Sequence, residues 1–381
     1  MSLPTVKSIE SVPLVYQLPD GAAYGSARGR LPARQSTLVR LTTSDGVIGW
    51  GEAFGSVDVV GACVRELAPT VIDRQLDSAS GWFTHHLQRS YHSTYGGPHV
   101  AAASALDVAM WDALGRTLGV SVGRLLGGRV RDRVTAYAST GYVTATRDLA
   151  AFVDEITAAV EQGFDAVKIK LGLGPAEDRR RVEATREVIG ADRALMVDFN
   201  GNYSADVALR VLRGLDDLDL AWAEEPVPPE DVGGMRLVRA AGVPTASGEA
   251  LYTRFGFRDL IAERLVDVVQ PDVCKCGGLS EARVIAHLAQ TWNVRFSPHV
   301  WCGVVGQAAS LQLLAAVPDY PAPEHVSEPL RFEFDRGPNA LRDELALQPL
   351  QVSAGVVTIP DAPGLGVELD EQAIERLRSD R

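Results

Sequence analysis

The feature that most constrains the fold is a regular series of charged residues in the second half of the chain. Its members are separated by 30, 26, 25, 23 and 27 residues, and each ends a short apolar run typical of a buried strand. A strand and its return helix need about that many residues, so the spacing predicts a repeated βα unit. The series is Lys168, Asp198, Glu224, Glu249, Asp272 and His299.

This repeat predicts an α/β fold containing a (β/α)8-type barrel. The barrel is expected over residues 126–350, after an α+β capping domain in residues 1–125. The C-terminal segment 351–381 is expected to fold back and complete the cap. In such a barrel the carboxyl ends of all strands meet at one face, where catalytic groups lie. The charged series would therefore converge there.

Local patterns set the expected elements. Residues 5–16 and 36–50 alternate apolar and polar side chains, and Ser44-Asp45-Gly46 predicts a hairpin turn. Residues 18–35 are rich in Gly, Pro, Ala and Arg and predict a mobile loop. Pro98 and the apolar spacing after it predict a helix over 98–118. The barrel is expected to begin with a strand near 134–140 and a helix at 148–162, and to end with an eighth strand near 326–335.

Composition excludes several function classes. The net charge of −12 without a basic patch makes nucleic-acid binding unexpected. Hydrophobic residues form 46% of the chain, enough for a large core, but charges interrupt every long apolar stretch, so no membrane span is expected. The N-terminus lacks the pattern of a signal peptide. With four cysteines, which we expect to be reduced structural thiols, a cytoplasmic location is the expectation.

Three carboxylates in the series predict a metal site. Asp198, Glu224 and Glu249 come from three consecutive predicted strands and supply hard oxygen donors. Such a set suits Mg²⁺, while the lack of histidine or cysteine among them argues against zinc. Glu225 follows Glu224 and points the opposite way on a strand. Its position before Pro226 favours Glu224, with Glu225 as the alternative.

Lys168 and Lys170 form a K-x-K pair whose side chains leave one face of a strand. A lysine near another cation in a dry pocket has a lowered pKa and can act as a base. We expect Lys170 to transfer the proton. Lys168 is expected to lower the pKa of its neighbour, orient metal ligands and touch the substrate carboxylate.

Asp272 and His299 end adjacent predicted strands and are expected to form a dyad that accepts or donates a proton. A metal with a base on each side of a bound carboxylate defines a reaction class. The proton α to the carboxylate is removed, and the metal and a lysine stabilise the enediolate. Whether Lys170 or His299 takes the proton is open, because the stereochemistry of the substrate decides it.

The chain resembles the mandelate racemase/muconate lactonizing enzyme family of the enolase superfamily. The resemblance covers nearly the whole sequence and rests on KIK, VDFN, AEEP, SGE, PDVCKCGG, SPHVW and IPDAPGLGVELD. Asp272 stands where muconate-lactonizing relatives carry a lysine, so the chain is most similar to the mandelate racemase subgroup. Asn200 matches a family position near the substrate and the metal, and Lys275 matches a lysine common before the GG in both subgroups; we expect both to contact the substrate. Glu333, or alternatively Glu328, matches an acid that donates to the substrate carboxylate.

The resemblance implies a Mg²⁺-dependent dehydratase of acid sugars or a cycloisomerase of their lactones. The alternative is a racemase or epimerase of a 2-hydroxy acid that uses the same bases. The partner is then a small-molecule carboxylate, and family members usually form homo-oligomers, either dimers or octamers.

Further substrate contacts are expected at the mouth of the barrel. Tyr24, with Arg28, Arg30 and Arg34 of the 18–35 loop, is expected to close over the substrate. Trp301 is expected to form a wall beside His299. Trp50 and Glu52, in GWGEA, are further candidates for lining the mouth.

Overall fold

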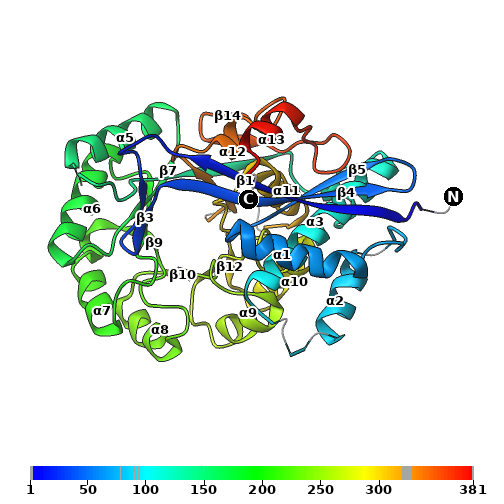
Figure 1. Cartoon of the computed structure of the whole chain (residues 1–381). Coiled ribbons are helices and arrows are strands. Elements are labelled where there is room, and N and C mark those ends of the chain that lie inside the picture. The colour runs from blue at the N-terminus through cyan, green and yellow to red at the C-terminus, as the bar shows by residue number, and fades with distance from the viewer. Residues whose placement is uncertain are drawn as a thin grey trace.

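The computed structural model describes residues 3–77, 79–89, 91–92, 95–146, 148–319 and 328–379. The N-terminal part forms a three-stranded antiparallel sheet in the order β1-β4-β5, covered by helices. Helices α5 to α8 lie along one side of the parallel strands in the view of Figure 1, and α1 and α2 lie on the other. The elements of this first part are β1 (Val6–Gln17), β4 (Ala33–Thr43), β5 (Ile48–Ala53), α1 (Val57–Leu67), η1 (Ala68–Thr70), α2 (Ala79–Arg89), α3 (Pro98–Leu118) and α4 (Val122–Leu125).

Helix α3 has the bounds that the sequence predicts. Pro98 occupies its first turn, where a missing N–H costs no hydrogen bond. The helix ends at Gly119, whose φ of 70° is a left-handed conformation that glycine adopts without strain. Its buried face packs on β5, so the long helix ties the cap together.

Eight parallel strands, each followed by a helix, form the barrel. Strands β6 to β12 pair in sequence order, and β13 pairs with β6. Between β12 and β13, Ser297 Oγ donates a hydrogen bond to the Arg331 carbonyl at 3.2 Å. The predicted barrel is therefore confirmed. The strands are β6 (Arg133–Thr140), β7 (Ala166–Lys170), β8 (Ala194–Asp198), β9 (Leu220–Glu224), β10 (Thr245–Ser247), β11 (Val268–Val269), β12 (Arg295–Phe296) and β13 (Arg331–Asp335).

The barrel helices lie outside the strands, and most of them bury one apolar face. The eighth strand is shorter than predicted, and residues 326–327 of that prediction lie outside the described residues. The helices are α5 (Leu149–Glu161), α6 (Pro175–Ile189), α7 (Ala205–Arg213), η2 (Asp216–Leu218), α8 (Val232–Val238), η3 (Arg239–Ala241), α9 (Thr253–Ala262), α10 (Gly278–Thr291), α11 (Val304–Ala316) and the short α12 (Ala340–Asp343).

The prediction of a loop throughout 18–35 is wrong. This segment contains a small hairpin, β2 (Tyr24–Ser26) with β3 (Gly29–Leu31), and β4 begins at Ala33. Gly25 and Val143 exchange two backbone hydrogen bonds, of 3.1 and 2.9 Å, which join the hairpin to the loop after β6. Arg28 Nε donates to the Asn200 carbonyl, and its Nη2 donates to the Gly201 carbonyl at 2.8 Å. These long-range contacts are invisible in the local composition.

The C-terminal segment contacts both parts of the chain. Its hairpin, β14 (Val352–Ser353) with β15 (Val356–Thr358), extends the barrel sheet beside β6. Beyond it, the Leu365 N–H donates to Asp112 Oδ1 on α3 at 2.7 Å. Helix α13 (Glu371–Leu377) contacts β1. The domain boundaries at 125 and 350 remain predictions.

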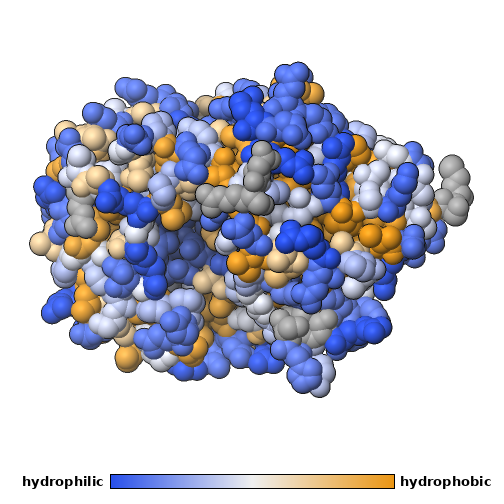
Figure 2. All heavy atoms as spheres, in the orientation of Figure 1, coloured by the Kyte–Doolittle hydropathy of each residue, from blue (hydrophilic) through white to orange (hydrophobic). Residues whose placement is uncertain are grey.

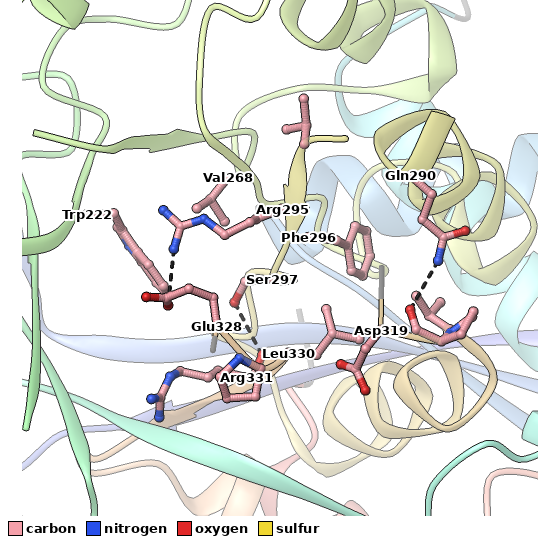
Figure 3. A pocket seen from close by; sticks show the side chains of 14 residues that line it. Trp222, Val268, Gln290, Arg295, Phe296, Ser297, Asp319, Glu328, Leu330 and Arg331 are labelled. Carbon is pink, nitrogen blue, oxygen red and sulfur yellow. Dashed lines mark hydrogen bonds and ion pairs between the residues drawn. The ribbon is translucent and has the colours of Figure 1, made fainter. Parts of the chain in front are cut away.

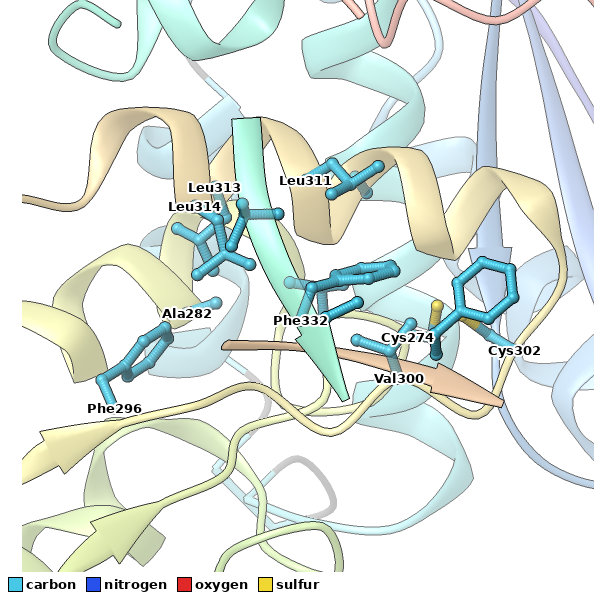
Figure 4. Close-up of a cluster of buried hydrophobic side chains, with 14 of the residues drawn as sticks. Cys274, Ala282, Phe296, Val300, Cys302, Leu311, Leu313, Leu314 and Phe332 are labelled. Carbon is cyan, nitrogen blue, oxygen red and sulfur yellow. The ribbon is translucent and has the colours of Figure 1, made fainter. Parts of the chain in front are cut away.

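Two large groups of buried apolar residues hold these elements. One fills the space between the barrel strands and their helices, and the other lies within the cap. Figure 4 shows part of the first, where Phe332, Val300 and Cys274 lie near α11. The strand ends therefore rest on a close-packed frame. None of the described helices combines the length and apolar character needed to span a bilayer.

Candidate active site

Three carboxylates meet at the carboxyl ends of three neighbouring strands. Asp198 and Glu224 are the last residues of β8 and β9, where they are register partners. Glu249 follows β10 by two residues. One oxygen of each lies within 4.8 Å of the others, and the group is largely buried. The structure thus brings together the three predicted metal ligands.

The alternative ligand, Glu225, does not belong to this group. It has a φ of 39°, which turns the backbone just past the end of β9. Burial, together with the charge of Glu249, raises the pKa of Glu225 well above its ordinary value. Glu225 Oε1 is buried and lacks a hydrogen-bond partner among the described residues.

Glu224 is held by three donors. Lys168 Nζ donates to Oε1, Gln270 Nε2 donates to Oε2 at 2.5 Å, and Trp222 Nε1 lies 3.3 Å from Oε2. The sequence does not single out Gln270 as a site residue, although Gln270 lies two residues before Asp272 on a predicted strand. A polar residue at an inward-facing position of a barrel strand is the feature that could have identified Gln270 as part of the site.

The two lysines have different surroundings. Lys168 is 1% exposed, contacts Glu224 and lies 2.8 Å from Glu333 Oε1. Burial alone would lower the pKa of Lys168, but Glu224 and Glu333 outweigh it and raise that pKa well above its ordinary value. Burial raises the pKa of Glu333, but Lys168 and His299 bring it down to about 2. Lys168 is therefore an internal member of the ligand network.

Lys170 pairs with Asp198 and lines a cavity. Burial would lower its pKa, but the charge of Asp198 more than offsets burial and leaves the pKa raised. The expectation of a lowered pKa is therefore wrong for this arrangement. The Asp198 carboxylate approaches Lys170 more closely than the sequence indicates. Its effect on the pKa of Lys170 therefore exceeds the effect of the neighbouring lysine.

The predicted dyad is assembled. His299 Nδ1 lies 2.8 Å from Asp272 Oδ2, and His299 Nε2 lies 3.3 Å from Glu249 Oε2. Burial would lower the pKa of His299, but Glu249 and the hydrogen bond with Asp272 raise it to about 9. Asp272 Oδ1 also accepts from the Cys274 N–H at 2.7 Å, which fixes its orientation.

Lys170 and His299 line one cavity of about 290 Å³. The cap contributes the β2–β3 hairpin and Phe54, while the barrel contributes the charged groups. In the space-filling view this face of the molecule is hollowed, and hydrophilic residues surround part of the recess (Figure 2). The lining residues are Gly25, Ser26, Arg28, Gly29, Arg30, Leu31, Phe54, Tyr142, Lys170, Asn200, Glu249, His299 and Trp301.

Asn200 and Trp301 line this cavity as predicted substrate contacts should, whereas Tyr24 and Lys275 do not. The Tyr24 hydroxyl donates to the Pro338 carbonyl at 3.0 Å, and the side chain lines a neighbouring cavity. The Lys275 ammonium lies 5.3 Å from the centres of the Phe54 and Tyr252 rings.

Some sequence interpretations of the mouth need correction. Arg34 is buried against Asp335, 3.2 Å away, so it is a structural residue. Glu52 is also buried and accepts from the N–H groups of Gly303 and Gly306 at the start of α11, at 2.6 and 2.8 Å. Trp50 is 6% exposed and lies outside the cavity lining.

Glu333 and Glu328, the rival matches for an eighth-strand acid, lie at opposite ends of the barrel. Glu333 Oε2 accepts from the Val300 N–H at 2.9 Å, beside His299. Glu328 Oε2 lies 3.3 Å from Arg295 at the first residue of β12 (Figure 3). The structure therefore places Glu333 within the site and Glu328 outside it.

Glu52, Cys274 and Cys302 form a second buried group with ligand atoms within 4.8 Å of one another. It lacks the properties of a metal site. The Glu52 carboxylate already accepts hydrogen bonds from Gly303, Gly306 and Ser36. A hydrogen bond with Cys274 would lower the pKa of Cys302, but burial and nearby carboxylates outweigh it and raise this pKa to about 12, so the thiolate that a metal needs is disfavoured.

Known protein families match both parts of the chain. Residues 22–127 match the mandelate racemase/muconate lactonizing enzyme N-terminal domain. Residues 151–373 match the enolase C-terminal domain-like family.

Named relatives span nearly the whole sequence. The chain is 36% identical to D-galactarolactone cycloisomerase of Agrobacterium fabrum over 357 residues, covering 93% of this chain and 94% of that protein. It is 31% identical to D-gluconate dehydratase of Thermoproteus tenax over 391 residues, covering 99% of this chain and 74% of that protein.

Solved structures agree with the fold. The 3,6-anhydro-D-galactonate cycloisomerase from Zobellia galactanivorans superposes with a TM-score of 0.89 at 33% identity, covering 99% of this chain and 100% of that chain. A racemase from Streptomyces coelicolor A3(2) with bound magnesium superposes with a TM-score of 0.87 at 28% identity, covering 98% of this chain and 100% of that chain.

Proposed function

The chain belongs to the mandelate racemase/muconate lactonizing enzyme family of the enolase superfamily, and from this we propose a magnesium-dependent sugar-acid lyase or lactone cycloisomerase. The observation that carries the proposal is one cavity lined by two proton-transfer groups and bordered by a carboxylate trio. Lys170 lies on β7 and His299 follows β12, with the strands of the trio between them in the sheet. The two groups can therefore reach a substrate from different sides.

Asp198, Glu224 and Glu249 would hold the Mg²⁺. Their oxygens form a compact, buried set of hard donors, as magnesium prefers. Glu249 Oε2 is buried and accepts no hydrogen bond among the described residues, and its charged neighbour is His299 Nε2, 3.3 Å away. When bound, Mg²⁺ would supply positive charge that stabilises the enediolate formed from the substrate carboxylate.

Proton transfer falls to Lys170 and His299. One removes the proton from the carbon α to the carboxylate, and the electron pair forms a double bond to the β carbon. The bond from the β carbon to its oxygen breaks, and the second group donates the proton that this oxygen needs when it leaves as water. In a lactone the leaving oxygen belongs to the ring, so the ring opens and the released carboxylate stays attached. The enol product then becomes a keto acid.

The remaining polar residues position these groups. Asp272 orients the His299 imidazole through Nδ1, and Lys168 neutralises part of the charge on the trio. Glu333 links Lys168 to the backbone beside His299. We assign Asn200 to substrate contact, because it lines the cavity 3.5 Å from Glu249.

The same geometry also suits racemisation of a 2-hydroxy acid, in which a proton leaves one face and returns to the other. The similarity to a magnesium-bound racemase supports this second candidate. Elimination is favoured because named relatives at up to 36% identity are a lactone cycloisomerase and sugar-acid dehydratases.

A substrate screen tests the proposal. Sugar acids and aldarolactones are incubated with the enzyme and Mg²⁺, and keto acids are detected as semicarbazones. The control is the Lys170→Gln, His299→Asn double variant, which keeps the carboxylate trio. We expect a keto-deoxy acid only with the unchanged enzyme and only with Mg²⁺. Equal product from the double variant would refute the assignment of the two groups.

We further propose a cytoplasmic homo-oligomer. All four cysteines are unpaired, as in a reducing compartment. The family resemblance supports a dimer or an octamer, which light scattering on the purified protein distinguishes from a monomer.

A further inference from the structure

The Trp301 indole is fixed on two sides. The Arg34 guanidinium carbon lies 3.4 Å from the centre of the indole ring, so it covers one face. The indole Nε1–H donates to the Tyr142 hydroxyl at 3.0 Å. Trp301 also lines the cavity.

The residues that hold Trp301 are themselves immobilised. Arg34 is 4% exposed and pairs with Asp335, and its Nη2 donates to the Trp301 carbonyl at 3.0 Å. The Tyr142 hydroxyl donates to Asp335 Oδ1 at 2.5 Å. Hydrogen bonds tie the buried Arg34–Asp335 pair to Trp301 and Tyr142, which leaves the pair little freedom to move. Trp301 is therefore a preorganised flat surface beside His299.

The cavity lining combines aromatic and polar side chains. Tyr142 and Phe54 also line it, with the Phe54 ring 6.2 Å from that of Trp301. The hairpin contributes Ser26 and Arg30 to the same lining. A sugar ring offers both kinds of surface, with C–H groups on one face and hydroxyls at its edges. An open-chain acid lacks a fixed C–H face and loses more conformational entropy when it binds.

We propose that this cavity selects a cyclic sugar acid, such as an aldarolactone, whose ring C–H face stacks on Trp301. Trp301 is then a specificity-determining residue, and Arg34 and Tyr142 are positioning residues that hold it. The inference rests on the proposed function for the class of substrate, and goes beyond it in choosing the ring over the open chain.

The test compares two compounds with one carbon skeleton. These are a 1,4-lactone of a six-carbon aldaric acid and the open-chain acid produced by its hydrolysis. Their dissociation constants are measured calorimetrically with Mg²⁺ in a Lys170→Gln background, so that the lactone is not consumed. Each is measured again with Trp301→Leu, Trp301→Phe or Trp292→Leu added. Trp292 is 44% exposed at the end of α10 and serves as the matched control.

We expect Trp301→Leu to weaken lactone binding about tenfold and open-chain binding less than about threefold, as loss of an aromatic contact predicts. Trp301→Phe should retain most of the preference, and Trp292→Leu all of it. For each compound, the dissociation constant of the variant is divided by that of the protein with Trp301 intact. The extra charge of the open-chain acid is present in both constants, so its effect cancels when the two ratios are compared. Because binding is measured, a failure to detect turnover in the substrate screen would not affect this result.

Two outcomes would overturn the inference. One is an equal loss of affinity for the lactone and for the open-chain acid in Trp301→Leu. If the leucine variant does not fold, the corresponding outcome is that Trp301→Phe no longer binds the lactone in preference to the open-chain acid. The other is tighter binding of mandelate than of the lactone, which would assign the flat surface to an aromatic hydroxy acid.

Discussion

The Lys168 ammonium lies 2.8 Å from Glu333 Oε1, and both side chains are buried beneath the cavity. Glu333 also accepts from the Val300 N–H, one residue from His299. This contact connects the carboxylate trio to the loop that carries the histidine. It also gives the two lysines of the K-x-K pair separate roles, since only Lys170 faces the cavity.

The first prediction separates Lys170 from the other lysine near the mouth. Replacing Lys170 with Gln should lower kcat by about 10²–10⁴-fold, because a proton-transfer group is lost. Lys275→Gln should change kcat less than about threefold, because its ammonium lies over the Phe54 and Tyr252 rings. Steady-state kinetics on the substrate found by the screen measure both. Similar losses in the two variants would contradict this division.

The second prediction concerns metal binding. At a magnesium concentration about 100 times Kd, the unchanged protein should gain about 2.7 kcal/mol of stability. Glu249→Gln should lose most of this gain, because it removes one of three anionic ligands. Glu328→Gln, at the far end of the barrel, should keep it. Urea unfolding with and without Mg²⁺ provides the measurement, and a full gain in Glu249→Gln would place the metal elsewhere.

The third prediction concerns the dyad. Asp272→Asn should lower kcat by about 100-fold or more with little change in KM, because the His299 ring loses the partner that fixes its orientation. Asp259→Asn, an exposed aspartate paired with Arg258, is the control and should be silent. A rise in KM without a fall in kcat would instead assign Asp272 to substrate binding.

The sequence predicted most of what depends on regular spacing. Glu224 and Glu249 fall at strand ends because each βα repeat returns the chain to the same face, and this placed the trio without knowledge of side-chain contacts. The same rule applied to the first strand would have found Tyr142, which follows β6 by two residues and lines the cavity.

What depends on long-range contacts was not predicted. Tyr24 and Arg34 lie in one short segment, and composition alone suggested that both face the substrate. The structure turns them toward Pro338 and Asp335, more than 300 residues away. The pKa of Lys170 was predicted in the wrong direction for a similar reason, since the spacing of lysines says nothing about how closely Asp198 approaches.

The fourth prediction concerns acid stability of the cap. His86 is 7% exposed, its ring is stacked 5.2 Å from that of His99, and burial and His99 lower its pKa to about 4. A histidine with a lowered pKa in the folded state stabilises the protein above its ordinary pKa of about 6.5. That stability is lost as the pH falls toward 4.

Replacing His86 with Phe should therefore reduce the loss of unfolding free energy between pH 6.5 and 4. We expect a reduction of about 2 kcal/mol, less than the full shift implies, because the ring keeps some contact with water. Urea unfolding across this pH range measures it. His92→Gln, a change at an exposed histidine outside the stacked pair, should leave the slope as it is. An unchanged slope in His86→Phe would show that other groups govern acid unfolding.

The central claim is α-proton removal followed by β-elimination, with Lys170 and His299 as the two proton-transfer groups. The most direct measurement follows the best substrate by proton NMR in D₂O with Mg²⁺, for the unchanged enzyme and for Lys170→Gln and His299→Asn. The account predicts a keto-deoxy acid with deuterium at the new methylene carbon, and little product from either variant. Exchange of the α proton without loss of the β-oxygen would contradict it and identify a racemase.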